Sequence, residues 1–483
     1  MIRALAALAL LPALASATPW TRLLVEVDDD GARVVAASPG RAPSTPDAAP
    51  TDPRWLHAEE PVDGRWTGEL VLRERAVLAL DVPGDVLGRT LPLRIGERTV
   101  DLAVPLSPAA PPSLPRDGLE VRTLVDSGPS DARQDVVFLA EGYTEDERER
   151  FFDDATAALS YLALLEPHDT TLGLVNVHGV FTPSAESGAD HPEAEPPTAA
   201  DTALHCTYGA FDIDRLIVCD DAAVLALATE APGDDVRVVL VNDPTYGGSG
   251  GVTYATAYTG ELMEQTVAHE MGHSDAGLAD EYLYGGPAPA GALPVPNCSP
   301  AAATTPWDAW RDDDTVDAFP GCSWTDWFRP TDDQCLMNVL QDRFCPACRE
   351  RVVTTVWSHL DRIVVEASPN EAALGLGDEI TFTVDTVPLD GAELAWAWWL
   401  DGQLQPETGP SLTLQRRELA RGEHDLRVEV GLDTPFVRGE RAPAMDDSVD
   451  FAVTAEGCGC YGGTPRGAWL LLFLLPLGRR RVT

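Results

Sequence analysis

The chain has 483 residues, a formal net charge of −44 and 44% hydrophobic residues. This length suggests about three domains with sizeable cores. The strong negative charge excludes nucleic acid as a partner, because its phosphates would repel the protein.

The N-terminus has the three parts of a secretory signal peptide. Arg3 supplies a short positive region, residues 4–14 are apolar, and Ala15-Ser16-Ala17 matches an A-x-A cleavage site. The apolar run is too short to span a bilayer. We therefore predict that residues 1–17 are removed and that the protein is exported, with Thr18 as the first mature residue.

Residues 18–125 show short runs of alternating apolar and polar residues, as in 23–27 and 70–72, and no long helical pattern. This pattern predicts an N-terminal β-domain. The Pro-rich stretch 105–115 is typical of a linker.

Strands and helices alternate from residue 126 onwards. Apolar runs at 136–139, 174–177 and 236–241 predict buried strands, and residues 145–165 predict a helix. Such alternation indicates an α/β layer. We place one domain over residues 126–362.

Residues 269–273 form an H-E-x-x-H motif behind a helical apolar pattern at 262–268. Because His269 and His273 are four residues apart, they share one face of a helix. Two imidazoles so placed can bind one Zn²⁺. Glu270 is the candidate general base for a water molecule.

A carboxylate follows the motif closely enough to complete the metal site. Gly277 can end the helix so that the chain turns back towards the metal. Asp280 is then the candidate third ligand, with Glu281 as the alternative. Glu281 and Tyr282 are otherwise expected to support the ligands without binding zinc.

Residues 269–282 resemble the H-E-x-G-H-S-x-x-G-L-x-D-E-Y signature of the IgA-peptidase family of secreted zinc metallopeptidases. Residues 135–144, 335–337 and 344–349 resemble other segments of that family, so the resemblance covers about 126–360. It implies a metzincin-like zincin fold. Met337 then has two interpretations, an apolar Met-turn beneath the zinc or an ordinary core methionine.

Cysteine usage agrees with an oxidising compartment. Cys206 and Cys219 are close enough in sequence to pair with each other. Cys345-Pro-Ala-Cys348 could be a redox motif or a second zinc site, but a structural disulfide is the preferred interpretation. The seven cysteines before the C-terminal tail leave one that is either free or bonded to another molecule.

Residues 363–455 return to short alternating strands at 380–384, 395–400, 412–414 and 426–430. They predict an Ig-like β-sandwich. Trp396, Trp398 and Trp399 could form a carbohydrate platform, although we expect at least one of them in the core.

The C-terminal residues 456–483 combine Cys458-Gly459-Cys460, an apolar run at 468–477 and three arginines at 479–481. The run falls short of the ~20 residues of a membrane helix. The tail resembles the bacterial MYXO-CTERM sorting type, which implies transient membrane contact and delivery to the cell surface (outer membrane) or the exterior. A retained anchor is the alternative.

The predicted function is a zinc-dependent endopeptidase that acts on protein or peptide substrates. One zinc ion bound by His269, His273 and Asp280 would polarise the scissile carbonyl. The alternative is a surface adhesion or binding protein with an inactive zincin fold, but the intact Glu270 argues against it. The acidic residues 186–191 could hold Ca²⁺, although an exposed loop explains them better.

Overall fold

The computed structural model describes residues 20–456 except 29–30, 41–74, 84–85, 96–97, 110–116, 211–212, 252, 289–291, 293, 361, 388–392 and 440. The predicted signal peptide and sorting tail lie outside the described residues. The chain divides into two units. One contains the residues up to Glu366 with Asp385–Trp396 and Glu429–Ser448, and the other contains Ala367–Val384, Ala397–Val428 and the residues from Val449 on. In the described part of the chain, no helix has the length and apolarity needed to cross a membrane.

The N-terminal region consists of strands, as the alternating pattern predicts. An antiparallel sheet has the order β2-β1-β3, and a separate pair joins β4 to β5. The bounds are β1 Trp20–Asp28, β2 Gly31–Gly40, β3 Arg75–Pro83, β4 Thr90–Ile95 and β5 Arg98–Ala103. Leu24 and Ala36 from this sheet pack against Leu225. A buried ion pair, Arg22 to Asp234 at 2.7 Å, joins the sheet to the next region.

A six-stranded sheet of order β10-β11-β9-β7-β8-β6 forms the centre of the first unit. The bounds are β6 Glu120–Val125, β7 Gln134–Glu141, β8 Val175–Phe181, β9 Val236–Val241, β10 Gly248–Gly250 and β11 Ala255–Tyr258. The four inner strands run parallel, and the two edge strands run antiparallel to their neighbours. The predicted buried strands correspond to β7, β8 and β9. The sheet begins with β6, ahead of the boundary predicted at residue 126.

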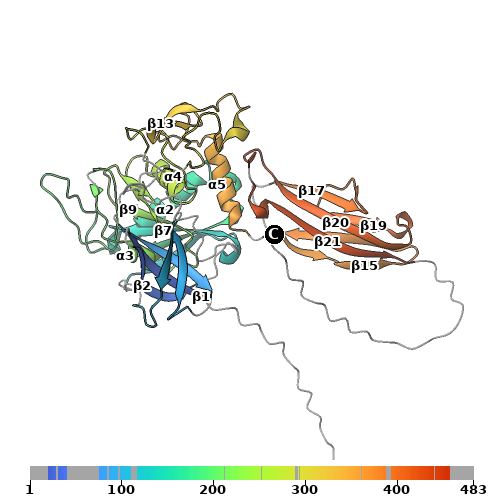
Figure 1. Cartoon of the computed structure of the whole chain (residues 1–483). Helices are drawn as coiled ribbons and strands as arrows, with labels where there is room; N and C mark the ends of the chain where they lie inside the picture. The colour runs from blue at the N-terminus through green and yellow to red at the C-terminus, as the bar shows by residue number, and fades with distance from the viewer. Residues whose placement is uncertain are drawn as a thin grey trace, which may run out of the picture. The chain divides into compact units, whose positions relative to one another are not determined.

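Helices cover both faces of this sheet (Figure 1). The bounds of the helices of this unit are α2 Arg148–Leu162, α3 Asp221–Ala228, α4 Met263–Ser274 and α5 Pro346–Ser358, and α2, α3 and α4 contact the sheet. The side chains of Val180 and Phe181 on β8 point to opposite faces. Phe181 contacts Phe151 of α2, and Val180 shares an apolar cluster with Val224 of α3. The inner strands are therefore buried on both sides, which explains the apolar runs in their sequences.

A small hairpin and two disulfides complete the first unit. The hairpin pairs β12, Phe319–Cys322, with β13, Trp324–Arg329. Cys206 is bonded to Cys219, which confirms the predicted pair, and Cys298 is bonded to Cys322.

The C-terminal strands form two sheets, of order β14-β16-β19 and β15-β21-β20-β17-β18. The bounds are β14 Val364–Ser368, β15 Glu371–Leu374, β16 Glu379–Thr386, β17 Glu393–Leu400, β18 Gln403–Leu404, β19 Ser411–Gln415, β20 Gly422–Asp433 and β21 Asp446–Ala455. Trp398 is fully buried and stacks on Phe451, with ring centroids 5.7 Å apart. At least one of the three tryptophans is therefore in the core, as expected.

Candidate active site

The H-E-x-x-H motif lies on the last turns of helix α4. His269 and His273 occupy the same face of the helix, and both are buried, with ring centroids 4.8 Å apart. Gly277 follows with φ +61°, a left-handed conformation that glycine adopts without strain. Leu278 N then donates to Gly272 O at 3.0 Å. The chain thus turns back past the histidines, as the position of Gly277 predicts.

Three ligand atoms meet in a small triangle. His269 Nε2 lies 3.2 Å from His273 Nε2, and Asp280 Oδ1 lies 3.0 Å from the first nitrogen and 3.4 Å from the second. Ligands about 2.0–2.1 Å from a tetrahedral zinc are separated from one another by ~3.3 Å. The residues present therefore fit a zinc ion, and Asp280 is the carboxylate beside the two histidines.

The other ring nitrogens are held by backbone carbonyl oxygens. His269 Nδ1 lies 2.9 Å from Leu336 O, and His273 Nδ1 lies 2.7 Å from Leu278 O. A carbonyl oxygen can only accept, so each Nδ1 carries the proton and donates it. In the neutral form of each ring, Nε2 therefore keeps its lone pair towards the triangle, which is the tautomer that a metal needs.

Glu270 is buried and lies between the helix and the edge of the central sheet. A Cβ atom added to Gly248 of β10 would lie 3.0 Å from Glu270 Oε1, and one added to Gly250 would lie 2.4 Å from Glu270 O. Glycine at these positions lets β10 approach α4 closely. The Glu270 carboxylate therefore lies close to the backbone of β10 at Gly248.

Residues 122–309 match the family model described as IgA Peptidase M64. This segment is a peptidase domain of the IgA peptidase M64 family. Peptidases of this family are metallopeptidases that act on proteins or peptides. The match includes the whole triangle and Glu270, and it ends before Met337. No curated protein matches the chain.

In the peptidase domain, Tyr284 has the supporting role at Asp280 that the sequence pattern predicts for Tyr282. The Tyr284 hydroxyl donates to Asp280 Oδ2. The Tyr282 hydroxyl instead accepts from Arg215 Nη2 at 3.1 Å. The sequence motif does not predict this role for Tyr284, because it does not show the path of the loop after Asp280.

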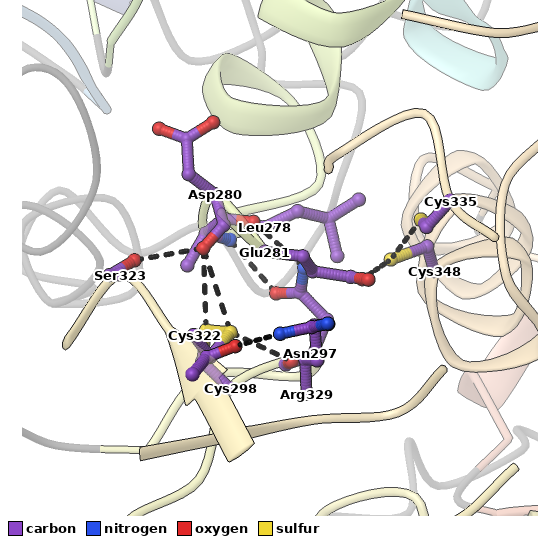
Figure 2. The surroundings of a disulfide bond; sticks show 12 residues. Leu278, Asp280, Glu281, Asn297, Cys298, Cys322, Ser323, Arg329, Cys335 and Cys348 are labelled. Carbon is purple, nitrogen blue, oxygen red and sulfur yellow. Dashed lines mark hydrogen bonds between the residues drawn. A yellow bond between two sulfur atoms is a disulfide. The ribbon is translucent and has the colours of Figure 1, made fainter. Parts of the chain in front are cut away.

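The backbone and the side chain of Asp280 are both fixed. Ser323 Oγ donates to Asp280 O at 2.9 Å, as Figure 2 shows. Burial would raise the pKa of Asp280, but His273 and His269 outweigh it and hold that pKa well below its usual range. The carboxyl group is therefore an anion, the form that binds a metal.

Glu281 does not join the histidines. Figure 2 shows its side chain directed away from that of Asp280 and towards the cysteines. Asn297 Nδ2 donates to Glu281 Oε1 at 3.2 Å. Burial raises the pKa of Glu281 well above its usual range. The structure thus places Asp280, and not the alternative Glu281, at the triangle.

Met337 lies in a turn directly beneath helix α4. It is fully buried, and its Sδ would be 2.7 Å from a Cβ atom on Gly272. Met337 O accepts from Glu281 N at 2.7 Å. The neighbouring Leu336 O holds His269, as described above. This position supports the Met-turn interpretation over that of an ordinary core methionine.

The predicted disulfide between Cys345 and Cys348 is wrong for this structure. Both are free and buried, and so is Cys335, which makes three free thiols where the odd count required one. In the described residues, two groups of side chains could hold a metal ion, namely His269, His273 and Asp280, and Glu281, Cys335, Cys345 and Cys348. The acidic residues 186–191 belong to neither group.

Proposed function

We propose that this protein is an exported zinc endopeptidase and that His269, His273 and Asp280 hold the zinc. The observation that carries the proposal is the triangle of Nε2, Nε2 and Oδ1 atoms with edges of 3.0–3.4 Å. Three protein ligands leave the fourth tetrahedral position to water or substrate, as in catalytic zinc sites. When bound, zinc would supply Lewis-acid chemistry to the scissile carbonyl and to water.

Glu270 is the group that moves the proton. The oxygen of water bonds to the carbonyl carbon, the C–N bond breaks, and a carboxyl group and an amine are formed. One proton of the water passes through a Glu270 carboxylate oxygen to the departing nitrogen. Burial between α4 and β10 restricts water around this carboxylate, so the proton is transferred within the site.

The arrangement supports a metzincin-like zincin fold. Gly277 turns the chain after the zinc helix, the third ligand follows at once, and Met337 lies beneath the helix. The helix itself packs against an edge strand that runs antiparallel to its neighbour. These features agree with the layout that the sequence predicts.

Export is proposed from the two ends of the sequence, and the disulfides support it. The bonded pairs Cys206–Cys219 and Cys298–Cys322 suit an oxidising compartment. We expect the exported protein to lack residues 1–17 and the segment after about Gly463. Intact-mass measurement of the exported form checks this, and a mass that includes residues 469–483 would identify a retained anchor.

The proposed function is tested by metal content and by cleavage of an unfolded protein substrate. Chelation should abolish cleavage, and added Zn²⁺ should restore it. His273→Ala should lose both zinc from this site and activity. Glu264→Ala, on the same helix but outside the triangle, is the matched control and should retain both. Full activity in His273→Ala would rule out the proposed mechanism.

A further inference from the structure

A second cluster of ligand-type side chains lies next to the triangle, outside the residues that the proposed mechanism uses. Glu281, Cys335, Cys345 and Cys348 are all buried, and each offers one atom within 4.8 Å of the atoms offered by the others. Three of the four residues lie beyond the segment that matches the peptidase family. The cluster therefore requires its own explanation.

The chain brings these groups together from three segments. Cys345 is the N-cap of α5, Pro346 begins the helix, and Cys348 lies in its first turn. Cys345 N donates to Cys335 Sγ at 3.3 Å. Both the helix N-terminus and this backbone amide favour the thiolate form of cysteine. The local structure thus gathers the sulfurs at the N-terminus of one helix.

The distances fit a metal better than a disulfide. Cys335 Sγ and Cys348 Sγ are 3.6 Å apart, close to the ~3.8 Å between sulfurs bound at about 2.3 Å to a tetrahedral zinc. A disulfide needs about 2.05 Å. Glu281 Oε1 lies 3.3 Å from Cys348 Sγ and 3.6 Å from Cys345 Sγ. The carboxylate is therefore a fourth neighbour of the sulfurs.

The carboxylate also has an unsatisfied atom. Glu281 Oε2 is buried and has no hydrogen-bond partner in the described structure. Burying a carboxylate without full compensation is costly. A disulfide between two of the thiols would leave Glu281 Oε2 without a partner and the third cysteine unbonded. A cation would instead bind both the carboxylate and the thiols.

We propose that Glu281, Cys335, Cys345 and Cys348 form a second, structural Zn²⁺ site. Four protein ligands fill a tetrahedral shell and leave no position for substrate, so the site is closed. Its ligands tie the Asp280–Glu281 segment to the turn that holds Met337 and to the start of α5. Because Leu336 O in that turn orients His269, the second site positions two ligands of the first.

Zinc content of the full-length protein tests this site separately from the peptidase activity. Cys345→Ser should lower zinc by about one ion per chain. Ala347→Ser, a buried change in the same helical turn that removes no ligand, should leave it unchanged. The same loss of about one ion is expected when Cys345→Ser is made in the His273→Ala background. Because His273→Ala already lacks zinc at the first site, a further loss in this background comes from the second site. The proposal for the second site can therefore be tested even if the proposal for the first is wrong.

Cobalt substitution and peptide mapping test the unmutated protein, so the result does not depend on folding of the variant. Co²⁺ held by thiolates gives a sulfur-to-cobalt charge-transfer band that a His-His-Asp site does not give. We expect this band in the wild type and in His273→Ala. Absence of the band, zinc content that Cys345→Ser does not change, or a mapped disulfide between any two of Cys335, Cys345 and Cys348 would overturn the proposal.

Discussion

The two metal-type clusters differ in how the chain builds them, although Asp280 and Glu281 are consecutive residues. The first takes two ligands from one turn of α4 and its third from the loop that follows. The second takes its ligands from three segments: Glu281 lies more than fifty residues before Cys335, and Cys345 and Cys348 follow Cys335 closely. Figure 2 shows the two carboxylates pointing in different directions. One short segment can therefore serve two sites of different chemistry.

The ligand sets of the two clusters also imply different roles, one catalytic and one structural. Two imidazoles and one carboxylate leave a coordination position open, and an acid–base group lies beside them. Three thiols and a carboxylate make a closed set with no such neighbour. The comparison therefore predicts that changes at the first cluster abolish catalysis, whereas changes at the second remove its own zinc and affect catalysis only through the ligands that it positions.

The largest effect is expected for Glu270→Ala. Loss of the proton-transfer group should lower kcat by about 10²–10⁴-fold, because general acid–base catalysis contributes that much. Zinc content should not change, since Glu270 is not a ligand. Steady-state cleavage and metal analysis of the same preparation measure both, with Glu264→Ala as the control. If Glu270→Ala cleaved as fast as wild type, the first cluster would have no catalytic role to distinguish it from the second.

The neighbouring carboxylates can be separated by paired substitutions. Asp280→Ala should abolish stoichiometric zinc at the histidines and keep the thiolate–cobalt band, because its carboxylate faces only the first cluster. Glu281→Ala should weaken the band and slow cleavage by ~10–100-fold at most, the range for groups that support a ligand. Metal titration measures both variants. The reverse ranking would reassign the third ligand to Glu281.

Gly272→Ala tests the packing between α4 and the Met337 turn. The new Cβ would lie 2.7 Å from Met337 Sδ, and overpacking of this kind costs about 1–3 kcal/mol in free energy of unfolding. Gly409→Ala is the matched control, because a Cβ there has nothing within 4 Å. Chemical denaturation compares the two. Equal stability would show that Met337 does not press against the helix.

The parts predicted from sequence are those fixed by local spacing. Helical periodicity places His269 and His273 on one face, and apolar runs locate β7, β8 and β9. The nature of the thiol cluster was not predicted, because the spacing in Cys345-Pro-Ala-Cys348 suits both a disulfide and a metal. Whether the pair forms a disulfide or binds a metal depends on Cys335 and Glu281, and only the tertiary fold brings these two residues close to Cys345 and Cys348. Edge strand β6, Glu120–Val125, lies before the domain boundary predicted at residue 126, because its place beside β8 depends on the tertiary fold.

The smallest effect is expected for Tyr284→Phe, and it tests the loop that the sequence could not place. The Tyr284 hydroxyl donates to Asp280 Oδ2, so its loss should loosen the carboxylate and weaken zinc binding by ~10-fold, the lower end of the range for such supporting groups. Tyr282→Phe is the matched control, since the Tyr282 hydroxyl accepts a hydrogen bond from Arg215. Competition with a chelator measures both affinities. If Tyr282→Phe weakened zinc more than Tyr284→Phe, the supporting role would return to Tyr282, and the path of the loop after Asp280 would differ from the one described.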